Sequence, residues 1–302
     1  MAIILQESLR AIFYAPFYVA LARDAFAAEG VEVQFASAPR PGDAALGLFT
    51  GTVDVCWGGP MRVMETYQLR PDCDLVSFAE IVTRDPFLLV GRGARPGFSP
   101  ADLLGLKLAS VSEVPTPWMC LQEDVRRAGA DPTRIARIGD RGMADNVAAL
   151  RRGDIDVVQL FEPYVSELLE DPAYHVWYAQ ADRGPTSYTT FYARRPTLTA
   201  RRDELLRMVR AIAKTESWVA SASGADIAAQ IESYFPTVPP TRLIAACARY
   251  KSLDIWGTTP ILPRAGYDRL RASLVSGGFV APGTSFEVAV DNSLAEAAQA
   301  GG

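Results

Sequence analysis

Hydrophobic and polar positions alternate with two different periods along the chain, and the change of period marks out its elements. Short runs that alternate residue by residue, such as VEVQFA at residues 31–36, predict strands. Longer stretches with a helical period, such as residues 15–29, predict helices, and glycine ends several of them, as Gly30 and Gly51 do. Strands and helices in alternation favour an α/β architecture, with a largely parallel sheet covered by helices on both faces.

The pattern divides the chain into a part where strands and helices alternate and a C-terminal part that is helical. We expect strands at residues 2–6, 31–36, 53–57, 75–82, 87–90, 106–111, 135–138, 155–160 and 188–193. We expect helices at residues 15–29, 41–50, 61–69, 116–128 and 145–152, and then at 202–221, 225–234, 240–254, 265–276 and 292–300. Thr116 is placed to cap the helix that follows it, with Pro117 at the first helical position.

One segment of the first half is echoed later in the chain. LFTGTVDV at residues 48–55 matches LRRGDIDV at residues 150–157. Both read as the end of a helix, a glycine turn and a strand entered as [VI]-D-V. The two copies predict two similar α/β lobes rather than one continuous sheet.

The two echoed strands end differently, in CWGGP at residues 56–60 and in FEPY at residues 161–164. In open parallel sheets, ligands bind beyond the carboxyl ends of the strands. Two lobes that face each other would therefore place Trp57 and Glu162 on opposite walls of one cleft.

Composition and charge narrow the class of protein. The 302 residues are 49% hydrophobic and 22% charged, which is a globular composition with length enough for two domains. The net charge is −5 and Lys and Arg form no strong cluster, so we expect no nucleic-acid partner. No stretch reaches the roughly 18 apolar residues of a transmembrane helix, so we expect no membrane insertion. The start, MAIILQESLR, lacks the features of a signal peptide. We therefore expect a periplasmic location if an export signal was removed, and a cytoplasmic one otherwise.

Cysteine and histidine are too few and too scattered for common catalytic or metal sites. Cys56, Cys73, Cys120 and Cys247 form no C-x-x-C pair, and His175 is the only histidine. We expect buried free thiols, no metal and no cofactor. A single histidine gives no convincing Ser-His-Asp set, and neither of the common glycine-rich phosphate motifs occurs.

Several motifs follow one another in a recognisable order: APFYVALA at residues 15–22, FAAEGVEV at 26–33, GTVD at 51–54, NVAALRRGDID at 146–156 and EPY at 162–164. Their order and spacing resemble the substrate-binding proteins of ABC importers, in the group that handles nitrate, sulfonates, taurine and thiamine-pyrimidine precursors. The resemblance implies the two-lobed, type II periplasmic-binding-protein-like fold with C-terminal helices. It places lobe I at residues 1–88 plus 192–302, lobe II at residues 92–187, and hinge crossover strands near 87–92 and 189–194.

The resemblance also implies a function. We expect a solute-binding protein that captures a small planar ligand, aromatic or heterocyclic and with a polar edge, and delivers it to an ABC permease complex. The alternative is a cytosolic lyase or decarboxylase of an aromatic acid on the same fold. The pyrimidine-synthesising enzymes of the group, which use pyridoxal phosphate with a lysine and a histidine in the first lobe, fit less well, because residues 1–100 contain neither lysine nor histidine.

The candidate ligand-binding residues lie near strand ends and helix starts. They are Phe13, Tyr14, Trp57, Gly59, Arg62, Arg84, Thr116, Trp118, Glu162, Tyr164, Ser187 and Tyr188.

Each main candidate also has a structural alternative. The aromatic members would stack on a flat ring, although Trp57 and Trp118 could equally belong to the core. Free N–H groups beside Thr116 suit an anionic group, or Thr116 is a plain helix cap. Arg84 could clamp a carboxylate or sulfonate or pair with its neighbour Asp85, and Glu162 could accept hydrogen bonds from the ligand or lie in solvent.

Overall fold

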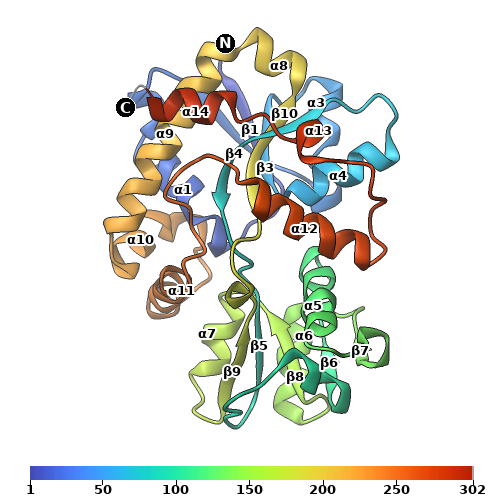
Figure 1. Ribbon diagram of the computed structural model, residues 1–302. Helices are drawn as coiled ribbons and strands as arrows, with labels where there is room; N and C mark the ends of the chain where they lie inside the picture. Colours follow the sequence, from blue (N-terminus) through green and yellow to red (C-terminus); the bar gives the residue numbers. More distant parts are fainter. Residues whose placement is uncertain (301–302) are drawn as a thin grey trace.

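The computed structural model describes residues 1–300 and contains two five-stranded sheets, one in each half of the molecule (Figure 1). The first has the order β2-β1-β3-β10-β4 and the second β7-β6-β8-β5-β9. The strands of the first sheet are β1 (Ile3–Glu7), β2 (Val33–Ser37), β3 (Val55–Gly58), β4 (Leu75–Val82) and β10 (Thr189–Arg194). Those of the second are β5 (Leu88–Arg92), β6 (Lys107–Ala109), β7 (Ala136–Ile138), β8 (Val157–Leu160) and β9 (Tyr174–Ala179).

Both sheets are mixed, which corrects the expectation of a largely parallel sheet. In the first, β1 runs parallel to β2 and β3, whereas β10 runs antiparallel to β3 and β4. In the second, β6 runs parallel to β7 and β8, whereas β5 runs antiparallel to β8 and β9. The antiparallel strands β5 and β10 are the ones that enter each sheet from the other half of the molecule.

The helices of the alternating part are shorter than expected in two places. They are α1 (Ala15–Ala22), α2 (Ala25–Ala28), α3 (Leu46–Thr50), α4 (Pro60–Leu69), α5 (Thr116–Arg127), α6 (Met143–Arg152) and α7 (Tyr164–Leu169). The helix expected over 15–29 is interrupted because Asp24 adopts a left-handed conformation with φ 51°. Of the helix expected over 41–50, only α3 and a short 3-10 turn at Pro41–Asp43 form.

The C-terminal helices surround the first sheet, and two of them also reach the second half (Figure 1). They are α8 (Arg195–Ala200), α9 (Arg202–Ser221), α10 (Gly224–Ile231), α11 (Pro240–Ser252), α12 (Arg264–Ser276), α13 (Phe286–Ala289) and α14 (Ser293–Ala300). Helix α11 contacts α7, and α12 contacts α5. No helix in the described part is both long and apolar enough to span a bilayer.

The echoed motif has the same structural role in both halves. The carboxylates of Asp54 and Asp156 each accept a 2.8 Å hydrogen bond from a backbone N–H of the neighbouring strand, at Ile4 and Lys107. The preceding glycines end their helices with φ 73° and 80°, a conformation that favours glycine. The repeat therefore fixes the start of the central strand of each sheet.

The chain passes between the sheets twice, at residues 83–87 and 180–188, which we call the crossing segments. A buried network joins them: Arg183 forms an ion pair with Asp85 over 2.6 Å and a second one with Asp124 of α5. Burial raises the pKa of Asp85, although the positive charge of Arg183 opposes this. The expected lobe boundaries remain a prediction, and the strand pairing favours placing the hinges at these segments.

Candidate functional site

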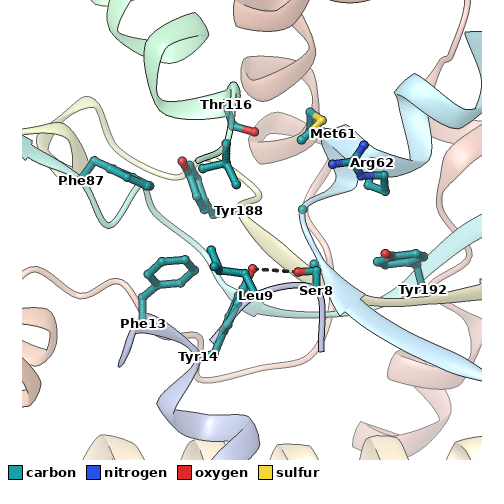
Figure 2. Close-up of a pocket in the computed structure, with 13 residues that line it drawn as sticks. Ser8, Leu9, Phe13, Tyr14, Met61, Arg62, Phe87, Thr116, Tyr188 and Tyr192 are labelled. Atoms are coloured by element: carbon teal, nitrogen blue, oxygen red, sulfur yellow. Dashed lines mark hydrogen bonds between the residues drawn. The ribbon is translucent and has the colours of Figure 1, made fainter. Parts of the chain in front are cut away.

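The candidate site is a pocket where the two halves of the molecule meet (Figure 2). It encloses about 490 Å³ of space, part of which is open to solvent. The residues that line it are Ser8, Leu9, Phe13, Tyr14, Gly58, Gly59, Met61, Arg62, Phe87, Val114, Thr116, Tyr188 and Tyr192.

The position of the pocket follows from the direction of the strands. Ser8 follows the carboxyl end of β1, Gly58 ends β3, and Val114 lies in the loop that leaves β6. Such ends of parallel strands are where open α/β sheets bind ligands, because the chain turns away there and leaves a crevice. The aromatic residues come from the 3-10 turn Ile12–Tyr14, from both crossing segments and from β10.

The two glycines after Trp57 allow the end of β3 to pack closely against neighbouring segments of the protein. A β-carbon at Gly58 would lie 3.1 Å from the Ser8 hydroxyl and 3.3 Å from the Tyr192 ring. A β-carbon at Gly59 would lie 3.2 Å from the Tyr188 carbonyl oxygen. All three distances are tight for a β-carbon, so glycine lets the end of β3 approach the other pocket walls.

Aromatic side chains form one wall of the pocket. The rings of Phe13 and Tyr14 meet edge to face at 4.4 Å between centroids. Phe87 and Tyr188 lie 6.3 and 6.4 Å from Phe13 and 6.1 Å from each other. These distances lie within the range of favourable aromatic contacts, so the cluster presents a continuous apolar surface.

Hydroxyl groups mark the polar side of the pocket. The Tyr14 hydroxyl lies 3.3 Å from that of Ser8, whereas the hydroxyls of Tyr188 and Tyr192 contact no hydrogen-bond partner among the described residues. Burial raises the pKa of Tyr14 to about 12, and it raises the pKa of Tyr188 and Tyr192 well above the usual value. All three phenols are therefore neutral near pH 7 and can donate hydrogen bonds.

Arg62, in the first turn of α4, is the only charged side chain among the thirteen lining residues. Its side chain is 15% exposed, and Nη1 donates to a carboxylate oxygen of Glu65. Within residues 1–300, Nε and Nη2 contact no acceptor, so two donor groups of the guanidinium remain for another molecule. No group of three or more potential metal ligands is assembled in the described part of the chain.

About half of the predicted ligand-binding residues surround this pocket. They are Phe13, Tyr14, Gly59, Arg62, Thr116 and Tyr188. Thr116 does not cap its helix as expected: α5 begins at Thr116, the cap position is Pro115, and no side chain closes the end.

Trp57 is corrected from a cleft wall to a core residue. Its side chain is 0% exposed and lies between the rings of Phe17 and Phe35, at centroid distances of 4.5 and 5.2 Å. Tyr18 meets it edge to face at 5.5 Å. Side chains alternate between the two faces of a strand, and this alternation turns Trp57 toward the α1 face instead of along the strand into the pocket.

Trp118, Tyr164 and Arg84 also lie outside the pocket. Trp118 is 7% exposed, packs with the apolar side chains of the second half, and carries the Arg137 guanidinium over its ring at 4.5 Å. Tyr164 begins α7 and is half-buried against Phe161. Arg84 lies half-buried in the first crossing segment.

Glu162 is corrected from a ligand-binding residue to a buried ion-pair partner. It is 0% exposed and accepts from Nε of Arg249 at 2.7 Å and from the Ser166 N–H at 2.8 Å. The Glu162 backbone N–H donates to the Tyr250 hydroxyl oxygen at 2.8 Å. Since Arg249 and Tyr250 belong to α11, Glu162 joins the two halves of the molecule.

Replacing Glu162 with glutamine is expected to lower the free energy of unfolding by about 2–4 kcal/mol, because the buried pair loses one charge. Glu170→Gln is the matched control, since Glu170 pairs with Arg242 of the same helix but its side chain is 57% exposed. Glu170→Gln should lower the free energy of unfolding by less than about 1 kcal/mol. Urea denaturation measures both, and equal stability of Glu162→Gln and wild type would contradict this assignment.

Ser187 is fully buried beside the pocket but does not line it. Its backbone N–H donates to the Gly266 carbonyl oxygen at 3.2 Å, and its hydroxyl lowers the pKa of Glu80, which burial raises. Ser187 is therefore an interior residue of the second crossing segment that faces Glu80 of β4.

Sequence reasoning missed several lining residues. These are Ser8, Leu9, Gly58, Met61, Phe87, Val114 and Tyr192. The strand-end rule contains the signal for Ser8 and Gly58, because each marks the carboxyl end of a predicted strand. Tyr192 lies within β10 and carries no comparable signal.

Comparison with known proteins gives one family match over most of the chain. The family described as NMT1/THI5-like matches residues 12–222. The putative binding protein YtlA of Bacillus subtilis is 24% identical over 292 residues, which cover 96% of this chain and 87% of YtlA.

Solved structures show the fold. The periplasmic aliphatic sulphonate-binding protein SsuA of Escherichia coli aligns with a TM-score of 0.76 at 17% identity, covering 92% of this chain and 93% of SsuA. The alkanesulfonate-binding protein SsuA of Xanthomonas axonopodis pv. citri, bound to MOPS, aligns with a TM-score of 0.72 at 14% identity, covering 97% and 98%. These likenesses confirm the predicted type II periplasmic-binding-protein-like fold.

Proposed function

The chain belongs to the NMT1/THI5-like family, and from that premise we propose that it is a solute-binding protein of an ABC import system that captures a small organic anion with a flat apolar body. The observation that carries the proposal is the pocket between the two halves, with an aromatic wall and a single guanidinium. YtlA and the SsuA proteins, which are named as binding proteins, support the binding role.

The sign of the ligand's charge follows from Arg62. Its side chain is largely buried, and only one of its nitrogens is engaged by Glu65. A carboxylate or sulfonate can accept from two guanidinium N–H groups at once, and such bonds are strong where water is mostly excluded. A ligand with a positive charge would instead meet this guanidinium with no carboxylate among the lining residues to pair with, which argues for an anion.

The shape of the ligand follows from the aromatic wall. Phe13, Tyr14, Phe87 and Tyr188 present ring faces and edges over a distance that suits one aromatic or heterocyclic ring. Ring contacts contribute about 0.5–1.5 kcal/mol each beyond burial of area. The free hydroxyls of Tyr188 and Tyr192 would hydrogen-bond polar atoms at the ligand's edge.

The contribution of both halves supports capture by closure. Thr116 and Val114 come from the second half, whereas Ser8, Tyr14 and Arg62 come from the first. A ligand held between them would be enclosed as the crossing segments bend, which is the hinge motion of two-lobed binding proteins. We infer that the enclosed form is the one that an ABC permease complex recognises.

A panel of probes tests this function. Toluenesulfonate and benzoate are the expected ligands, while toluenesulfonamide and benzylamine are a neutral and a cationic control of similar size. We expect the anions to raise the melting temperature and to bind in isothermal titration calorimetry with one ligand per chain. We expect benzylamine to do neither.

Turnover separates the proposal from the lyase alternative. Chromatography of each probe after prolonged incubation should recover it unchanged. Loss of carbon dioxide from an aromatic acid would favour the decarboxylase, and binding of benzylamine in preference to the anions would contradict the proposed ligand class.

A further inference from the structure

Two carboxyl groups lie in the core without a described partner. Glu80 of β4 is 2% exposed and Glu216 of α9 is 0% exposed. Both oxygens of Glu216 and one of Glu80 accept no hydrogen bond from any residue in the described range. Buried carboxylates are almost always paired with cations or several donors, so this pair requires a physical explanation.

The elements packed around Glu216 bring no cation to it. Helix α1 carries no charged residue, and Arg23, which follows it, lies over the ring of Trp218. Helix α2 is followed by Glu29, which pairs with Lys214, and α14 contributes only the exposed Glu296. On α9 itself, Arg207, Arg210 and Lys214 precede Glu216 by spacings that turn them to other faces of the helix.

Helix α11, the loop that follows it and strand β4 also bring no cation to Glu216. Lys251 of α11 donates to the Val219 and Ala220 carbonyl oxygens at the end of α9, and Asp254 of the next loop is exposed. Glu80 faces the Ser187 hydroxyl and pairs in register with Thr190 of β10. The charged group that acts on Glu216 is therefore Glu80.

The electrostatic consequence is a retained proton. Burial raises the pKa of Glu80 to about 8. Burial, together with the negative charge of Glu80, raises the pKa of Glu216 well above its usual value. Near pH 7 the pair holds at least one proton, because two buried carboxylates without a counterion repel each other.

The pair lies directly beneath the loop that joins α11 to α12. A β-carbon at Gly257 would lie 2.9 Å from Oε1 of Glu216. The same loop is hydrogen-bonded to β4 at Glu80 and at the next residue: the Glu80 N–H donates to the Pro260 carbonyl oxygen at 2.8 Å, and the Gly257 N–H donates to that of Ile81 at 2.8 Å. A change in the charge of the pair would therefore act on this loop and on β4 together.

Both crossing segments are hydrogen-bonded to β4 or to the loop that joins α11 to α12. The Thr83 N–H donates to the Ile255 carbonyl oxygen and the Thr186 N–H to that of Thr83, each at 2.7 Å. The Tyr188 N–H donates to the Val82 carbonyl oxygen at 2.9 Å. In the loop, Nε1 of Trp256 donates to the Phe13 carbonyl oxygen at 2.9 Å. The pocket residues Tyr188 and Phe13 are thus hydrogen-bonded to β4 and to the loop over Glu80 and Glu216, respectively.

We propose that Glu80 and Glu216 form a proton-binding site that couples pH to the arrangement of the crossing segments and, resting on the proposed function, to the affinity of the pocket. With a proton bound, one carboxyl group carries no charge and the loop, β4 and the crossing segments stay together. When the proton leaves, a second uncompensated charge lies in the core, and the region opens to admit water.

The sign of the pH dependence follows from the raised pKa values. A carboxyl group whose pKa is higher in the folded state stabilises the fold at low pH. That stability is lost as pH rises from the ordinary range of glutamate toward about 8. With one histidine in the chain, few other side chains titrate across this range.

Glu216→Gln tests the site, because the amide mimics a protonated carboxyl and leaves Glu80 as the only titratable group of the pair. We expect the wild-type melting temperature to fall by about 5 °C or more between about pH 6 and about pH 9, and that of Glu216→Gln to fall by less than half as much. Glu296→Gln, which removes the same charge from an exposed position of α14, should keep the wild-type slope.

Measurements with and without ligand distinguish a failure of the acid-pair proposal from a failure of the proposed function. We expect the radius of gyration of the free wild-type protein, from small-angle scattering, to rise over the same pH range, and toluenesulfonate affinity to fall at least about threefold more in wild type than in Glu216→Gln. If no probe binds, the proposed function fails, but melting and scattering still test the acid pair.

Two outcomes would overturn the proposal. One is a wild-type pH slope that persists unchanged in Glu216→Gln. The other is a rise in wild-type melting temperature at about pH 8 on adding calcium or potassium chloride after chelator treatment, absent in Glu216→Gln, which would make the pair a cation site.

Discussion

Replacing Arg62 with alanine is expected to weaken toluenesulfonate binding about 100-fold, which corresponds to about 2.7 kcal/mol. The reason is that the guanidinium is the only charge among the pocket-lining residues and is largely buried, so nothing else in the lining can neutralise the ligand's anionic group. Isothermal titration calorimetry measures the loss directly. Arg62→Lys keeps the positive charge but cannot form bidentate hydrogen bonds, so its affinity for toluenesulfonate should fall about tenfold.

Two controls make this prediction specific. Arg70→Ala removes a cation at the end of the same helix, where Arg70 pairs with the exposed Asp72, and should leave affinity unchanged. The neutral toluenesulfonamide should bind wild type and Arg62→Ala about equally. If Arg62→Ala binds toluenesulfonate as well as wild type does, Arg62 is not the anion-binding group.

Trp57→Ala is expected to lower the free energy of unfolding by about 3–5 kcal/mol, the usual range for emptying a buried aromatic site. The indole is fully buried between two aromatic rings, and its removal leaves a cavity that Phe17 and Phe35 on either side would fill only in part. Urea denaturation measures the loss. Toluenesulfonate affinity, measured well below the melting temperature, should change by less than about threefold, because Trp57 does not line the pocket.

Trp218→Ala is the matched control for Trp57. Trp218 is half-buried on α9 beneath the Arg23 guanidinium, so its loss should cost about 1 kcal/mol. An unchanged stability of Trp57→Ala together with a large loss of affinity would restore Trp57 to the ligand site.

The elements with a clear period were predictable from the sequence. Strand β4 (Leu75–Val82) and helix α9 (Arg202–Ser221) have the expected bounds. The continuous apolar run of β4 predicts only a buried strand, and the long amphipathic stretch of α9 predicts only a helix. The repeated [VI]-D-V turn correctly predicted two sheets, because the aspartates at positions 54 and 156 hold neighbouring strands in both halves.

Strand direction could not be predicted in the same way. The strands β5 and β10 run antiparallel to their neighbours because each enters its sheet from the other half of the molecule, which is a matter of chain path. The break at Asp24 is also a tertiary effect, since nothing in the local apolar period requires a left-handed residue there.

The location of the pocket was predictable from the sequence, and its lining residues were predictable only in part. The strand-end rule points to the ends of β1 and β3, and the pocket lies there. It does not say toward which face a side chain points, and for this reason Trp57 was wrongly placed in the cleft while Tyr192 was missed. Glu162 was misplaced for another reason: its partner Arg249 lies far along the chain, and sequence spacing carries no sign of their contact.

The most direct test of the proposed anion-binding pocket is a crystal structure of the protein with bromobenzenesulfonate, located by anomalous scattering from bromine. We expect a single strong bromine peak against Phe13, Phe87 and Tyr188, with the sulfonate within hydrogen-bonding distance of Arg62. A bromine peak only on the outer surface, or a pocket without bound probe at saturating concentration, would contradict it.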